Sequence, residues 1–226
     1  GYMDTRQAAG RYGGWYVDFT AGAEYRNVDR WPRPVEGHRF DASVRGGFNA
    51  FRPDDSAGNL RVDGLFGWSL TAVRWQPLAG PWVVLGVRGT FDKVLGERPF
   101  YDQNRAGGRF RDELGKDKYF VGYGPYRSTG DGFAAFLAEV RFFFGEIKSR
   151  SFPFMFLASA FAEEGWLFDG WDPGPHLPTV GVSYEMIYKR SLVLRPYVAW
   201  GWVTTPEHPS DRKGNMMFAF SVLGPL

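Results

Sequence analysis

The chain has 226 residues, with 27 Lys and Arg against 25 Asp and Glu, and no cysteine. This length fits one domain of barrel or sandwich size. The lack of cysteine excludes a disulfide framework, a thiolate zinc site and a cysteine nucleophile. The even charge balance argues against a nucleic-acid partner. Aromatic residues make up 18% of the chain and glycines number 30, a combination that favours strands over helices.

An alternation of apolar and polar residues runs along most of the chain. In the first stretch the odd positions from Trp15 to Tyr25 are apolar, whereas Asp18, Glu24 and Arg26 lie between them. Successive side chains of a strand point to opposite faces, so this period of two predicts strands with one apolar and one polar face. The pattern predicts nine of them, at residues 13–26, 39–50, 60–71, 82–92, 136–144, 152–163, 180–188, 192–202 and 216–222.

The lengths of these strands suggest a membrane. The longest uncharged apolar run, residues 151–162, is too short for a transmembrane helix, which needs about 20 residues. The predicted strands have roughly nine to twelve residues, longer than the usual ~5–6 and close to the ~9–11 of a strand that crosses a bilayer. Aromatic residues near the ends of the apolar faces are expected to form membrane-interface girdles: Trp15, Tyr25, Trp68, Tyr188, Trp200 and Trp202.

Short and long connections alternate between the predicted strands. The short ones lie at 76–80, 146–150 and 189–190, and the long ones at 53–59, 96–132, 169–178 and 205–214. Transmembrane barrels have this order of short periplasmic turns and long external loops. In its strands, faces and connections, the chain resembles bacterial outer-membrane β-barrel proteins as a class.

The resemblance implies an all-β fold: a closed antiparallel up-and-down transmembrane β-barrel of eight to ten strands, ten being favoured. We expect residues 1–226 to form this single domain, with 1–12 as an N-terminal segment and 96–132 as a long extracellular loop. Nine strands are an odd number, and such barrels usually have an even one. A further strand is therefore expected in residues 1–12, in 118–126 or ahead of residue 1 in a longer parent chain.

The polar faces carry a set of charges that a lumen could hold. Neighbouring strands are expected to place Arg39 and Asp41 beside Arg61 and Asp63, and Arg88 beside Glu139 or Arg141. In a small barrel the charges would form a salt-bridged plug, and in a wider one they would line a narrow polar path. The predicted lumen network consists of Asp18, Glu24, Arg26, Arg39, Asp41, Arg45, Arg61, Asp63, Arg88, Asp92, Glu139, Arg141, Glu163, Glu185 and Arg195.

Residues suited to catalysis are scattered. The string from His208 to Asp211 contains the residue types of a catalytic triad but is typical of a polar loop, and nothing marks His38, Asp41 and Ser43 as a site. No histidine pair has metal-ligand spacing. The carboxylate pairs Glu163–Glu164 and Asp54–Asp55 favour solvated turns over a cation site. We therefore expect no catalytic residue, metal or cofactor.

The function expected from these features is that of a non-enzymatic outer-membrane barrel: a small channel, an anchor or a subunit of a cell-surface assembly. Its partners would be membrane lipid and lipopolysaccharide, with proteins binding through the 96–132 loop and no nucleic acid. The alternatives are an outer-membrane enzyme that modifies lipid A or phospholipid, the barrel of a polysaccharide or secretion export system, and a soluble lipocalin-like barrel. The last requires the opposite assignment of faces, with the apolar side inward.

Overall fold

A computed structural model gives the fold. It describes residues 14–29, 34–51, 61–96, 104–106, 128–149, 153–188, 192–203 and 213–223. Within these ranges, no helix has the length and apolar character that crossing a membrane requires. The expected N-terminal segment 1–12, the stretch 118–126, Asp54–Asp55 and the string from His208 to Asp211 lie outside the described residues.

The all-β prediction is confirmed. Ten strands of the described part join one sheet, and nine of them follow one another in chain order through eight antiparallel pairings, with β9 attached to β8. The nine are β1 (Gly14–Val28), β2 (Gly37–Phe51), β3 (Arg61–Ala79), β4 (Val83–Leu95), β7 (Gly132–Ile147), β8 (Phe154–Asp169), β10 (Thr179–Tyr188), β11 (Leu192–Val203) and β12 (Lys213–Leu223).

Antiparallel order places the connections at two ends of the sheet. The β3–β4 turn, which contains Gly80 in a left-handed conformation (φ 54°), lies at one end with the β7–β8 and β10–β11 connections. The connections between β2 and β3, β4 and β7, β8 and β10, and β11 and β12 lie at the opposite end. We call these the short-turn end and the long-loop end. The predicted alternation of connections matches this arrangement.

Two stretches expected to be loops contain strands. β9 (Asp172–His176) folds back on β8, which places a short strand within the predicted connection 169–178. Within 96–132, β5 (Asn104–Ala106) and β6 (Ser128–Gly130) form a separate two-stranded sheet. These strands were missed because each is short, and Gly and Pro interrupt the period in β9.

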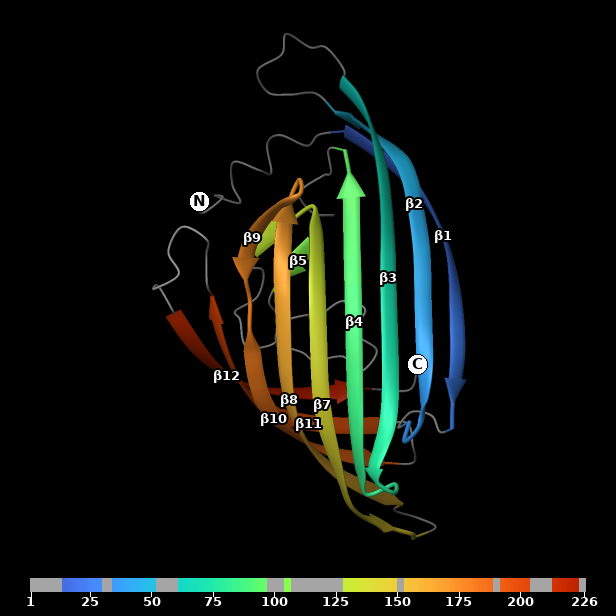
Figure 1. Ribbon diagram of the computed structural model, residues 1–226, viewed down its shortest axis with the longest axis vertical. Helices are drawn as coiled ribbons and strands as arrows, with labels where there is room; N and C mark the ends of the chain where they lie inside the picture. The colour runs from blue at the N-terminus through green and yellow to red at the C-terminus, as the bar shows by residue number, and fades with distance from the viewer. Residues whose placement is uncertain are drawn as a thin grey trace.

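The sheet is strongly curled. Figure 1 shows β3, β4 and β7 running upright while β10, β11 and β12 cross behind them. In the described residues, β1 pairs only with β2 and β12 only with β11, so the sheet is open between β1 and β12. Closure into a barrel and its strand number therefore stay predictions.

The two faces of the sheet have opposite chemistry. The outer face exposes large apolar side chains, such as Phe19 (75% exposed), Phe66 and Val182. The inner face buries charged ones, such as Arg88 and Glu163. A soluble lipocalin-like barrel would bury the apolar face, so this burial is opposite to the one that such a barrel requires.

Apolar side chains lie at both ends of the inner face and enclose its charged middle. Trp75, Leu157 and Ile187 are buried near the short-turn end. Leu65, Val94, Phe133 and Leu167 are buried near the long-loop end. The buried charges in the middle of β4, β7 and β8, such as Arg88 and Glu163, are therefore separated from both ends of the sheet by apolar packing.

Gly181 permits close packing at the centre of the inner face. A Cβ at this position would lie 2.5 Å from Phe161 Cζ and 2.6 Å from the backbone oxygen of Val198. A Cβ at Gly89 would meet nothing within 4 Å. The surrounding atoms therefore leave no room for a side chain at Gly181, whereas they do at Gly89.

We expect Gly181→Ala to lower the free energy of unfolding by about 1–3 kcal/mol, the usual cost of overpacking. Gly89→Ala, the matched control, should change it by less than about 1 kcal/mol because the site has room and alanine is less flexible than glycine. Denaturant unfolding in detergent micelles measures both. Equal effects of the two substitutions would contradict the packing assigned to Gly181.

Candidate functional site

Arg88 and Glu163 form a buried ion pair that spans three strands. The register places Arg88 of β4 opposite Leu137 of β7, and Leu137 opposite Glu163 of β8. Arg88 Nη2 donates to Glu163 Oε1 at 3.0 Å across the intervening strand. Leu137 lies on the strand between the two and belongs to a buried apolar cluster with Phe161, so hydrocarbon lies beside the pair.

Two further ion pairs lie on the inner face, one between β10 and β11 and one within β7. Arg195 Nη2 of β11 lies 2.7 Å from Glu185 Oε1 of β10, and both residues are 2% exposed. On β7, Arg141 Nη2 lies 3.3 Å from Glu139 Oε2. We call these six residues, Arg88, Glu163, Glu139, Arg141, Glu185 and Arg195, the inner ion-pair network.

Two buried serines lie in the same row of the sheet as Arg141 of the network. Arg141 lies opposite Ser159, and Ser159 opposite Ser183. The two Oγ atoms are 2.7 Å apart and buried. Three arginines and three glutamates balance the formal charge of the network, as expected where burial makes an unpaired charge costly.

A second charged group lies toward the open edge at β1. Arg39 Nε is 2.8 Å from Asp41 Oδ2 and 3.4 Å from Glu24 Oε1. Glu24 also contacts Arg26 at 2.5 Å. Because Glu24 and Arg26 are exposed whereas Arg39 is buried, solvent reaches this group from the β1 side.

The charged side chains predicted to line the lumen differ in how deeply they are buried. The side chains of Asp18 and Arg61 lie outside the described residues. Of the others, Arg39, Arg88, Glu139, Arg141, Glu163, Glu185 and Arg195 are buried, Asp41, Arg45, Asp63 and Asp92 are half-buried, and Glu24 and Arg26 are exposed.

One predicted juxtaposition is wrong. Arg39 and Asp41 were expected to face Arg61 and Asp63 on the next strand. In the β2–β3 register Asp41 lies opposite Thr71, and Asp63 lies opposite Asn49 at the long-loop end. The error arises because the two strands are antiparallel: the start of β2 lies opposite the later part of β3, whereas Arg61 and Asp63 are at the beginning of β3.

Lys93 is a buried cation that the sequence analysis missed. It is fully buried, its Nζ lies 2.5 Å from Asp131 Oδ1, and it also donates to the backbone oxygen of Gly170. Trp171 covers the same ammonium, 5.2 Å from the ring centroid. These contacts join β4 to the β8–β9 turn at the long-loop end. The signal available in the sequence was a lone lysine directly after the expected strand end at Asp92.

The predicted interface aromatics lie near the two ends of the sheet. Tyr25 and Tyr188 are near the short-turn end, and Trp68, Trp200 and Trp202 near the long-loop end. Tyr25 and Trp200 are exposed, whereas Trp68, Tyr188 and Trp202 are half-buried. Trp15 begins β1, and its side chain lies outside the described residues. Exposed Trp82 and Trp171, which were not predicted, lie at the short-turn and long-loop ends respectively.

The histidines of the described part stack on aromatic rings. His38 stacks on Tyr25 at 5.5 Å, and His176 on Trp166 at 4.9 Å. By strand alternation His38 points to the face opposite Asp41 and Ser43, so these three side chains do not converge. Glu163 is buried and Glu164 exposed, on opposite faces. Among the described residues, no three His, Asp or Glu side chains are placed to hold a metal ion.

Comparison with protein-family models, curated proteins and solved structures finds no match to this chain.

We expect Glu185→Gln to destabilise the fold by about 3–5 kcal/mol, because it leaves the Arg195 charge buried without its carboxylate. Glu146→Gln is the control: its exposed pairing with Lys148, at 3.9 Å, should contribute no more than about 1 kcal/mol. Chemical unfolding followed by tryptophan fluorescence reports both. Similar losses in the two variants would show that burial of the Glu185–Arg195 pair has no special cost.

Proposed function

We propose that this chain is an integral β-barrel protein of a bacterial outer membrane and acts without catalysis, as a membrane anchor or a subunit of a cell-surface assembly. The observation that carries the proposal is the reversal of the two faces. Large apolar side chains point outward along most of the sheet, and ionised ones point inward in pairs. In water this arrangement exposes apolar surface that a monomeric protein normally buries, whereas in lipid it is favourable.

The aromatic residues support the same orientation. Tyrosine and tryptophan side chains with an outward apolar face lie near both the short-turn end and the long-loop end, and the stretch between holds Val182, Val198 and Phe142. Rings at two levels with aliphatic and Phe side chains between them match the girdles and apolar band of a transmembrane barrel. The long loops would then face the cell exterior.

The inner ion-pair network favours an anchor over an open pore. Its six side chains are bonded to one another at the centre of the inner face and are enclosed by apolar residues toward both ends. Ions that crossed this region would have to break buried pairs, at a cost of several kcal/mol each. The buried ion pairs therefore favour an anchor, whose interior does not conduct ions.

We expect Val182→Arg to reduce the fraction of the chain that stays with carbonate-washed outer membranes. Val182 is 56% exposed, and it lies opposite Ala160 and Val198 in the middle of their strands. An arginine at bilayer mid-depth costs about 2–4 kcal/mol, and one near the interface about 0–1 kcal/mol.

Ile147→Arg is the control, because Ile147 is an exposed aliphatic residue at the short-turn end of β7. It should be retained like the parent chain. If carbonate releases the parent chain itself, the membrane proposal fails. If both arginine variants are retained equally, the depth assigned to Val182 is wrong.

A second function, as one part of a barrel closed by several chains, is favoured by strand direction. Nine strands linked by eight antiparallel pairings leave β1 and β12 pointing the same way. A tenth strand would close the barrel with every pairing antiparallel. Closure by further copies that cross the membrane in the same direction would instead pair β1 in parallel with β12 of the partner subunit. The exposed charged pair Glu24–Arg26 on β1 is compatible with a water-filled lumen of this wider kind.

The mass of the detergent-solubilised particle separates the two functions. Native mass spectrometry should give one chain if a tenth strand closes the barrel, which supports the anchor. A particle of two chains that falls apart when proline replaces two central β1 residues whose N–H groups face the open edge would support the multi-chain barrel, since proline removes those donors. Dimers that resist this change would contradict pairing through β1.

A further inference from the structure

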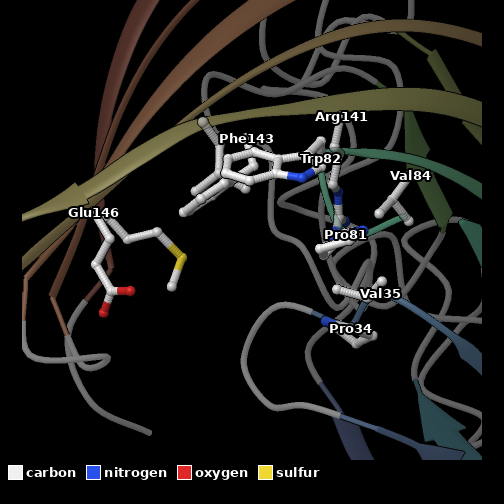
Figure 2. Close-up of a pocket in the computed structure, with 10 residues that line it drawn as sticks. Pro34, Val35, Pro81, Trp82, Val84, Arg141, Phe143 and Glu146 are labelled. Carbon is white, nitrogen blue, oxygen red and sulfur yellow. The ribbon is translucent and has the colours of Figure 1, made fainter. Parts of the chain in front are cut away.

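A cavity of about 180 Å³ opens on the inner side of the sheet at the short-turn end. Its walls come from three places: the residues just before β2, the β3–β4 turn, and the facing side chains of β7 and β8 (Figure 2). The lining includes Val35, Trp82, Arg141, Phe143, Met155 and Leu157.

The walls of this cavity are held by bonds of their own. The rings of Trp82 and Phe143 are 5.3 Å apart, and Phe143 N donates to Trp82 O at 2.8 Å. On the other side, the Asp29 carboxylate accepts from Val35 N at 2.9 Å and Glu36 N at 3.0 Å. A pocket with fixed walls loses little entropy on binding a ligand.

The polar group of the cavity is the Arg141 guanidinium. Arg141 is 8% exposed, and Nη2 is held by Glu139 at 3.3 Å. Within the part of the chain that the structure describes, Nε and Nη1 are buried and have no hydrogen-bond partner. Buried donors without an acceptor are costly, so a ligand that supplies an acceptor oxygen here gains their full hydrogen-bond energy.

The acidic side chains around this cavity have cationic partners, which limits their repulsion of an anion. Glu185, which also attracts Arg141, is held by Arg195 at 2.7 Å. Glu146 lies across the cavity from Arg141 in Figure 2, beside Lys148 at 3.9 Å. The Arg141 side of the cavity is therefore the favourable place for an anion, and the Trp82, Phe143 and Leu157 side is apolar.

We propose that this cavity binds a small organic carboxylate that carries one ring or a short branched chain. The carboxylate accepts from Arg141, for which guanidinium geometry is well suited, and the apolar group packs against Trp82 and Phe143. The volume fits a ligand of this size, since an apolar cavity of about 150 Å³ is known to hold benzene. The proposal goes beyond the membrane function and does not depend on it.

The test uses the full chain in a non-ionic detergent and two probes of the same shape, benzoate and uncharged benzamide. Saturation-transfer NMR titrations give the affinity of each. We expect benzoate to bind at least tenfold more tightly than benzamide. Equal affinity for the two probes would overturn the role of Arg141.

Two pairs of variants locate the binding. Met155→Trp fills the cavity and should abolish benzoate binding, whereas Phe144→Trp, on the exposed outer face, should leave it unchanged. Arg141→Gln should weaken benzoate at least tenfold and leave benzamide unaffected, whereas Arg88→Gln removes an equally buried arginine outside the cavity and should keep benzoate affinity. Benzoate binding that persists in Met155→Trp would overturn the proposed site, even if Arg141→Gln does not fold.

Discussion

The ion pair between Arg88 and Glu163 shows the constraint on which the rest of this structure depends. Both charges lie on the inner face, and the strand between them places Leu137 where a third polar group would otherwise stand. Each of these two charges is neutralised by the other across an intervening strand, so the positions of β4, β7 and β8 are fixed together. Glu185 and Arg195 impose the same condition on β10 and β11. Register is thereby specified by electrostatics as well as by hydrophobic alternation.

Hydrophobic alternation made the existence of the nine long strands predictable, because one side of each is more apolar than the other over most of its length. It failed at the ends of strands, where the polarity of the faces reverses. In β3 the inner face becomes apolar at Val73 and Trp75, and the outer face becomes polar at Arg74 and Gln76, which are bonded at 3.1 Å. The simple period ends there although the strand continues. Such a reversal is expected where a strand leaves an apolar band.

The individual partners within the candidate site could not be predicted in the same way. Alternation assigns a residue to a face, but the partner of a charge depends on register and on reach across strands. Arg88 bonds to Glu163 two strands away, and Arg39 bonds to Asp41 on its own strand. Lys93 escaped because strand-end lysines are ordinarily solvated. Its burial depends on Asp131 and Gly170, which come from connections with no periodic signal.

The same pairing rule explains why the short-turn end differs from the centre of the inner face. At the centre, the charged side chains satisfy one another in pairs that form across an intervening strand, along one strand or between neighbouring strands. On β7 and β8, the inner residues next to Arg141 toward the short-turn end are Phe143 and Leu157, which supply no acceptor. Its guanidinium is therefore bonded on one side by Glu139 and faces hydrocarbon on the other. A group that joins an acceptor oxygen to an apolar body complements both neighbours, which neither water nor a simple anion does.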